Sequence, residues 1–119
     1  MPPLPYYEEL KGITLDLDLE EGVTLGQSSP KNEIYLSSHH GIVFLRFEVY
    51  SLKFAEAYVD YKVAVIPEKY RPPQYFSWCT SLNPGQVVVA NVYTNGTVHL
   101  NVRPPSMTND VAIVGTFTW

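Results

Sequence analysis

The sequence predicts an all-β domain: a compact β-sandwich, a jelly-roll-like fold or a small barrel of seven or eight mostly antiparallel strands. The chain contains 10 Pro and 9 Tyr; Tyr is enriched in strands, and Pro is excluded from helix interiors. Apolar and polar residues alternate with a period of two along several segments, which is the pattern of a half-buried strand. Between two such segments lies Asn95-Gly96, a strong signal for a β-hairpin.

The expected strands follow one another at short spacing. The segment 37–41, which contains His39 and His40, is expected to interrupt them as a polar loop. Residues 52–57 are predicted to form at most one helical turn. Pro67 should end a strand, because it cannot donate a hydrogen bond to a ladder. Strands are predicted at 13–20, 34–36, 43–50, 59–66 and 76–80, in the two arms of a hairpin over 87–102, and at 111–119.

The hairpin over 87–102 carries the most specific local prediction. If Asn95 and Gly96 form its two-residue loop, Tyr93 pairs with Val98 and Asn91 with Leu100. Strand alternation then places these four side chains on the core face. The opposite face is predicted to hold His99, Asn101, Arg103, Val88, Ala90 and Val92.

A length of 119 residues suits one domain and leaves no room for two independent cores. We expect residues 1–12 to form a Pro-rich, acidic N-terminal arm and residues 13–119 to form a single β-domain. The first residues contain neither a basic segment nor an apolar run, so no secretory signal peptide is expected.

The net charge of −4 is concentrated near the N-terminus, where six acids and one base lie between Glu8 and Glu21. The chain has only 8 Lys and Arg residues, too few for the clustered cations that bind nucleic acid or an anionic membrane. Its apolar runs are all shorter than the ~18 residues of a membrane-spanning helix. We therefore expect neither nucleic-acid binding nor membrane insertion.

Residues that would indicate catalysis or a cofactor occur in no recognisable pattern. Cys79 is the single cysteine, which excludes an internal disulfide and a multi-cysteine metal site; its apolar neighbours favour a small buried side chain. The three histidines are accompanied by no Gly-x-Ser-x-Gly motif. The row Asp16, Asp18 and Glu20 is spaced too widely along one strand to close on Ca²⁺. We expect no enzyme activity, no catalytic residue, no cofactor and no metal site.

The segment 63–73, Val-Ala-Val-Ile-Pro-Glu-Lys-Tyr-Arg-Pro-Pro, resembles a phrase found in C-terminal receptor-binding (head) domains of phage tail and baseplate proteins. In those domains an apolar strand is followed by Leu/Ile-Pro-x-x-Tyr/Phe-Arg-Pro, then by another strand and a hairpin with a Gly-containing turn. The similarity covers roughly residues 41–119 and leaves residues 1–40 unmatched. Arg71, between Tyr70 and Pro72, is interpreted as a structural residue that bonds carbonyl groups of this turn.

The resemblance implies a compact β-domain of a phage that infects Gram-positive bacteria. Such domains assemble as trimers at the virion tail tip or baseplate, contact other tail proteins and bind host cell-wall saccharides. On this basis the expected function is non-enzymatic adhesion to a host-surface glycan, by a protein made in the host cytoplasm. One alternative is a structural baseplate or tail subunit that docks to other virion proteins. A second alternative is a bacterial carbohydrate-binding module.

Saccharide recognition requires an aromatic surface for the pyranose ring and a few fixed donors and acceptors for its hydroxyls. The candidate aromatic residues are Trp78 and Tyr75, although Trp78 is also a natural core residue. The candidate polar residues are His99, Asn101 and Arg103, which strand alternation places on one side, with His39 or His40 from a loop.

A homotrimer is expected from the resemblance and from apolar residues on strand faces that would otherwise be exposed to solvent. Apolar residues on a second sheet face imply that something covers it, and closed three-fold symmetry would do so. The residues on which this expectation depends are Phe44, Tyr50, Val88, Ala90 and Val92.

Overall fold

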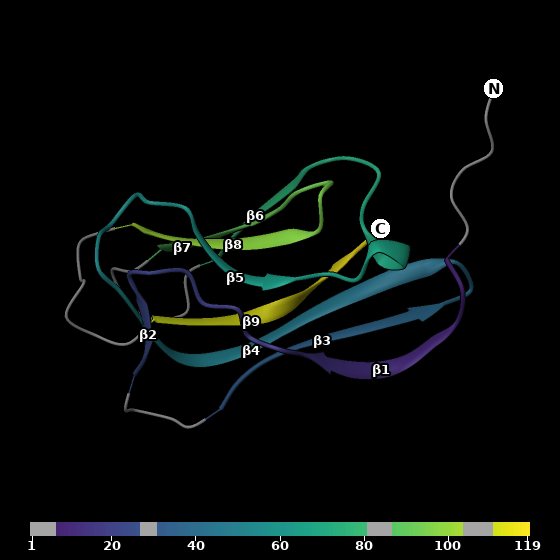
Figure 1. Ribbon diagram of the computed structural model, residues 1–119, viewed down its shortest axis with the longest axis horizontal. Coiled ribbons are helices and arrows are strands. Elements are labelled where there is room, and N and C mark those ends of the chain that lie inside the picture. Colours follow the sequence, from purple (N-terminus) through teal and green to yellow (C-terminus); the bar gives the residue numbers. More distant parts are fainter. Residues whose placement is uncertain (1–6, 27–30, 81–86, 104–110) are drawn as a thin grey trace.

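A computed structural model describes residues 7–26, 31–80, 87–103 and 111–119. These residues form nine strands and one 3₁₀ helix (η1, Glu68–Tyr70), and the strands lie in two sheets packed face to face (Figure 1). The predicted all-β fold is therefore confirmed, in the sandwich-like form among those expected and with more strands. Among the described residues no helix is long and apolar enough to cross a membrane.

Sheet A is built around the long strand β4 (Ile42–Phe54), which pairs with β3 (Asn32–His39) and with β9 (Val111–Thr118). Strand β1 (Leu10–Leu15) pairs with β3, and β2 (Val23–Leu25) pairs with the last residues of β4. All of these pairings are antiparallel. The inner face of sheet A forms half of the hydrophobic core.

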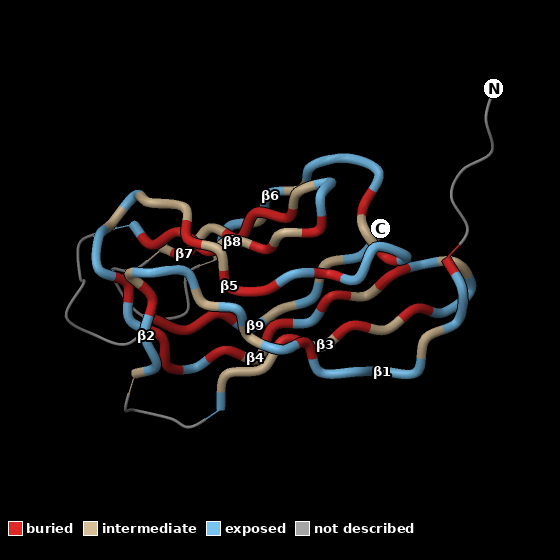
Figure 2. Tube along the Cα trace, viewed as in Figure 1, coloured by how far each residue is buried: buried red, intermediate tan, exposed pale blue. Residues whose placement is uncertain are grey.

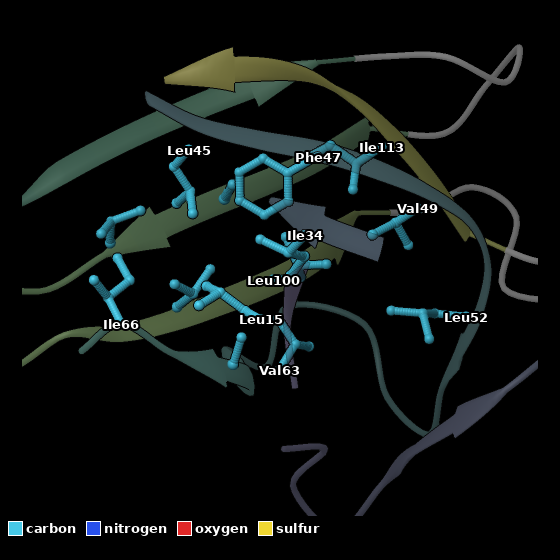
Figure 3. Close-up of a cluster of buried hydrophobic side chains, with 14 of the residues drawn as sticks. Leu15, Ile34, Leu45, Phe47, Val49, Leu52, Val63, Ile66, Leu100 and Ile113 are labelled. Carbon is cyan, nitrogen blue, oxygen red and sulfur yellow. The ribbon is translucent and has the colours of Figure 1, made fainter. Parts of the chain in front are cut away.

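Sheet B has the order β5-β8-β7-β6 and is also antiparallel. Its strands are β5 (Tyr61–Val65), β6 (Phe76–Thr80), β7 (Val87–Val92) and β8 (Thr97–Arg103). Along β7 and β8 the residues that face sheet A are buried, whereas most of the residues on the opposite side are partly exposed (Figure 2). The inner side chains meet those of sheet A in one cluster, in which Leu100 and Val63 lie near Ile34 and Leu15 (Figure 3).

The β3–β4 connection is tighter than predicted. The expected strand 34–36 is eight residues long, and the expected loop 37–41 is reduced to a two-residue turn because His39 pairs with Ile42. His40 and Gly41 have φ values of 51° and 75°, as a type I′ turn requires at both central positions. Glu9 supports this turn, because its Oε1 accepts a hydrogen bond from the His40 backbone N–H at 2.7 Å.

The predicted helical turn over 52–57 is wrong. Strand β4 continues to Phe54, and Leu52 and Phe54 are buried against the core. Strand β2 pairs with this end of β4, so an extended backbone gains ladder hydrogen bonds that a single helical turn would not supply.

The first strand begins earlier and ends earlier than predicted. Strand β1 starts at Leu10, inside the expected arm 1–12, and Tyr7 is buried, with its hydroxyl donating to Arg71 O at 2.9 Å. After Leu15 the chain leaves sheet A, and Asp18 N donates to Val63 O on the edge of β5. The alternating residues 16–20 therefore cover the edge of sheet B, where an open edge would expose unpaired backbone groups.

The predicted register of the β7–β8 hairpin is wrong by one residue. Asn91 pairs with His99, and Tyr93 N donates to Thr97 O at 3.0 Å, so the loop has three residues and ends at Gly96 (φ 88°). A three-residue loop with its last residue at positive φ is a common hairpin connection. The shift reverses the faces of β7, because strand side chains alternate, and leaves those of β8 as predicted.

The reversal changes the argument for a homotrimer. Val88, Ala90 and Val92 are buried in the core of the sandwich, so they need no second subunit to cover them. Of the five residues on which the expectation depends, only Phe44 and Tyr50 lie on the outer face of sheet A, on the side opposite the buried residues of β4.

Trp78 lies on the inner side of β6, because its cross-strand partner Ala90 is a core residue. Its indole packs edge-on against Phe117 at 5.2 Å between ring centroids, and it covers Gly115 of β9. The ring therefore joins the edges of the two sheets at β6 and β9.

We predict that Gly115→Ala destabilises the protein by about 1–3 kcal/mol. An added Cβ would overlap the Trp78 ring, and neither the aromatic ring nor the β9 backbone is free to move without losing packing. Chemical denaturation followed by tryptophan fluorescence measures the change in the free energy of unfolding.

Gly12→Ala is the matched control, since Gly12 also lies in a strand of sheet A and an added Cβ there meets no atom within 4 Å. Its stability should stay within about 0.5 kcal/mol of the parent. Equal stabilities for the two variants would contradict the packing described for Trp78.

Candidate functional site

Polar and aromatic side chains gather on the outer face of sheet B. The pairing Asn91 to His99 and Ser77 to Asn91 places side chains of β6, β7 and β8 in rows across this face. We use the name outer face of sheet B for the side chains that point away from the core: Tyr58, Asp60, Lys62, Tyr75, Ser77, Cys79, Val87, Val89, Asn91, Tyr93, Thr97, His99, Asn101 and Arg103.

Asp60, immediately before β5, is the centre of a hydrogen-bond network on this face. Its Oδ1 accepts from Asn91 Nδ2 at 2.8 Å, and its Oδ2 accepts from the Tyr93 hydroxyl at 2.6 Å. The Tyr75 hydroxyl donates to Asn91 Oδ1 at 2.6 Å. Both tyrosine rings are thereby held in place through a single carboxylate, and hydrogen bonds to a charged group are stronger than neutral ones.

His99 completes this arrangement, which we name the Asp60 cluster (Asp60, Tyr75, Asn91, Tyr93 and His99). Its Nδ1 lies 3.3 Å from Asp60 O and 3.5 Å from Asp60 Oδ2. The His99 ring meets Tyr93 edge-on at 4.8 Å between centroids, and Tyr93 lies 5.2 Å from Tyr75. Tyr75 is 51% exposed, so the cluster presents an aromatic surface to solvent.

The carboxylate of Asp60 raises the pKa of Tyr93 to about 12. The main cause is the hydrogen bond from the Tyr93 hydroxyl to Asp60, which holds the proton on the phenol; burial and the negative charge of Asp60 add to it. Tyr93 is thus a neutral donor over the whole physiological pH range.

A second group of residues lies further along β8. The guanidinium of Arg103 sits over the ring of Tyr58 at 5.5 Å from its centroid, a cation–π contact. Tyr58 N donates to Val102 O at 2.9 Å, which fixes its backbone beside β8. Between His99 and Arg103 lies Asn101, which is only 8% exposed.

Four of the residues expected for a site lie on the outer face of sheet B: Tyr75, His99, Asn101 and Arg103. Trp78 is not among them, because it faces the core and packs on Phe117 and Gly115.

His39 and His40 are also placed elsewhere, at the β3–β4 turn of sheet A next to β1 (Figure 1). There Glu9 accepts from the His40 backbone and lies 3.1 Å from His39 Nδ1, and these hydrogen bonds lower the pKa of Glu9. The two histidines therefore take part in holding the N-terminal strand to the turn.

Asp60, Asn91, Tyr93 and Tyr58 were not predicted as site residues. Asn91 and Tyr93 were assigned to the core by the two-residue loop at Asn95-Gly96. The polarity of Asn91 and Tyr93 was a signal against the predicted register, because that register would bury an amide and a phenol in the apolar core. The observed register, in which Asn91 pairs with His99, places both side chains on the opposite face. Asp60 is joined to them by contacts across 31 and 33 residues of sequence.

Cys79 is exposed on the outer face of sheet B, which corrects the expectation of a small buried side chain. Within the described part of the chain no group of three or more His, Cys, Asp or Glu side chains is arranged to hold a metal ion.

The chain matches no family model, no curated protein and no solved structure. The outer face of sheet B is therefore the basis for a functional proposal.

We predict that Asp60→Asn lowers the pKa of Tyr93 from about 12 toward its ordinary value of 10, because the negative charge that holds the phenolic proton is removed. The tyrosine ¹³Cζ chemical shift, followed against pH, measures this titration for each residue. Asp18→Asn is the control, since Asp18 pairs with Lys62 Nζ and makes no described contact with Tyr93. An unchanged Tyr93 titration in the Asp60 variant would contradict the network.

The same shift predicts how stability depends on alkaline pH. The folded protein binds the Tyr93 proton more tightly than the unfolded chain, so this contribution to stability is complete below pH 10 and is lost as pH rises from 10 to about 12. Tyr93→Phe should remove this part of the pH dependence in denaturation experiments. A parent and variant with the same slope in that window would contradict the prediction.

Proposed function

We propose that this chain is a non-enzymatic adhesion domain that binds a host cell-surface saccharide on the outer face of sheet B. The observation that carries the proposal is the hydrogen-bonded chain Tyr75–Asn91–Asp60–Tyr93, which fixes two aromatic rings on a solvent-facing sheet. The network satisfies the buried amide of Asn91 and at the same time fixes both rings. Ligand binding benefits from groups that are already held in their bound positions.

The chemistry of the Asp60 cluster suits a sugar. Aromatic rings provide apolar surface for the C–H groups of a pyranose, and a few placed polar groups give orientation. Tyr75 supplies the exposed ring. The hydroxyls of Tyr75 and Tyr93 donate their protons to Asn91 and Asp60 and are left as acceptors for a ligand, while the ring of His99 can add a donor or an acceptor. Binding would therefore require little rearrangement of the protein.

A phage tail tip is the biological setting that we propose for this activity, because of the resemblance carried by residues 63–73. In the fold this segment supports the β7–β8 hairpin: Arg71 Nε donates to Ile66 O at 3.1 Å, and Ile66 N donates to Gly96 O at 2.8 Å. Arg71 thus bonds a carbonyl of the turn, in agreement with its expected structural role. In this setting a homotrimer would cover Phe44 and Tyr50 on the outer face of sheet A.

A structural baseplate or tail subunit is the second candidate function, and the outer face of sheet A favours it. Tyr50 and Val114 are each 37% exposed there, and apolar side chains on a sheet face suit a protein contact. A bacterial carbohydrate-binding module would use the same sugar site as the first candidate. A monomer in solution would favour this module over a tail-tip domain, since tail-tip heads assemble as trimers.

We predict that Tyr75→Ala weakens saccharide binding by about 2 kcal/mol, or roughly thirtyfold in Kd, as expected for loss of an aromatic anchor. The variant also leaves Asn91 Oδ1 without its tyrosine donor, which should cost about 1 kcal/mol of stability. Titration calorimetry with cell-wall oligosaccharides measures the affinity, and thermal unfolding verifies that the variant is folded.

Tyr50→Ala is the matched control, because Tyr50 is a partly exposed strand tyrosine on sheet A. Its saccharide affinity should equal that of the parent. Failure of the parent domain to bind any cell-wall saccharide would favour the structural candidate, and equal losses in both tyrosine variants would argue against the outer face of sheet B as the site.

A further inference from the structure

The charged side chains on the outer face of sheet B differ in whether they already have a partner within the protein. The carboxylate of Asp60 already accepts hydrogen bonds from Asn91 and Tyr93. The ammonium group of Lys62 pairs with Asp18 at 3.0 Å. Arg103 forms no ion pair with any carboxylate of the described residues. Among the described residues of this face, its guanidinium is therefore available to bind an anionic group of a ligand.

The position of Arg103 leaves its donors available. Tyr58 lies against the guanidinium as a cation–π partner at 5.5 Å. A ring in contact with the flat face of a guanidinium leaves the N–H groups at its edge for a planar or tetrahedral anion. Arg103 is itself exposed at the end of β8, so these N–H groups are open to a ligand.

The backbone of Tyr58 adopts a strained conformation, in which its ring lies against the guanidinium of Arg103. Its φ is 63°, and its side chain is 63% exposed. A bulky residue with positive φ is an outlier, and such strain concentrates at ligand-binding sites, where the surrounding structure holds it. The hydrogen bond from Tyr58 N to Val102 O keeps this conformation beside Arg103.

Asn101 provides an independent observation. It lies between His99 and Arg103 on the same face of β8 and is more than nine-tenths buried, yet its Oδ1 accepts no hydrogen bond from the described residues. An unsatisfied buried acceptor is rare and destabilising. This oxygen is itself shielded from solvent, so the Asn101 side chain must turn outward before a hydroxyl or amide N–H of a ligand at Arg103 supplies the missing donor.

These features lie at a distance from the Asp60 cluster that a single sugar ring does not span. His99 and Arg103 are four residues apart on β8, which corresponds to about 13 Å at the rise of a strand. A ligand that contacts both groups must therefore be an oligosaccharide.

We infer that the ligand is an acidic oligosaccharide, whose carboxylate, sulfate or phosphate group is held by Arg103 while a neutral ring stacks on the Asp60 cluster. This inference rests on the proposed function and adds the charge and the length of the ligand. Asn101 contributes an acceptor between the two subsites, and Tyr58 positions the guanidinium.

The test uses the full chain and pairs of oligosaccharides that differ only in the acidic group: uronic-acid, sulfated and phosphate-bearing oligosaccharides, each with its neutral counterpart. At least one acidic member should bind about tenfold more tightly than its counterpart, and added salt should reduce the difference. The pair with the largest difference identifies the anion.

Arg103→Gln should abolish that difference by lowering the affinity for the acidic oligosaccharide to that of its neutral counterpart. Arg46→Gln is the matched control, because Arg46 also lies over a tyrosine ring, that of Tyr35 at 5.9 Å, on the outer face of sheet A. Its affinities should all equal those of the parent.

Asn101→Val separates a ligand contact from a structural role. Its thermal midpoint should equal or exceed that of the parent, since an orphan acceptor is removed, while the acidic oligosaccharide binds about tenfold more weakly. A lower midpoint with unchanged affinity would overturn the role of Asn101.

Equal binding of acidic and neutral oligosaccharides, or an acidic preference that survives Arg103→Gln, would overturn the inference and leave the proposed function in place. Absence of binding by every oligosaccharide would instead overturn the proposed function.

Discussion

The register of the β7–β8 hairpin is the constraint on which both faces of sheet B depend. Gly96 closes the turn with positive φ, and an added Cβ there would lie 2.7 Å from Ile66 O. Arg71 packs beneath the same turn and donates to that carbonyl. Because side chains alternate along a strand, this one turn decides that Val88, Ala90 and Val92 fill the core and that Asn91 and Tyr93 lie on the outer face of sheet B.

The outer face of sheet B combines rigidity with polarity. A carboxylate that accepts from an amide and a phenol is better satisfied than an isolated surface acid, and it immobilises the groups that bond to it. At the other end of the face, an orphan acceptor and a strained tyrosine are features that stability alone does not favour. The contrast between a satisfied cluster and an unsatisfied neighbour is the basis for the two subsites that we propose along β8.

The two sheets have different roles in this arrangement. Sheet A provides most of the long-range backbone pairing, through β4 and its neighbours, and its inner face forms the largest share of the core. Sheet B is shorter, and the segment after β1 covers its β5 edge by way of Asp18. At the opposite edge, Trp78 fills the space beside Gly115. A sheet fixed at both edges is a suitable support for preorganised side chains.

The sequence by itself determined the fold class, the position of most strands and the faces of β8, because a period of two in hydrophobicity is a local property of the chain. The residues His99, Asn101 and Arg103 could be placed on one face for the same reason. Tertiary structure decided the rest. The hairpin register depends on Ile66 and Arg71, which contact the turn from outside the hairpin. The hydrogen bonds of Asp60 join it to Asn91 and Tyr93, which lie more than 30 positions away in the sequence. A local sequence pattern cannot predict contacts between residues so far apart.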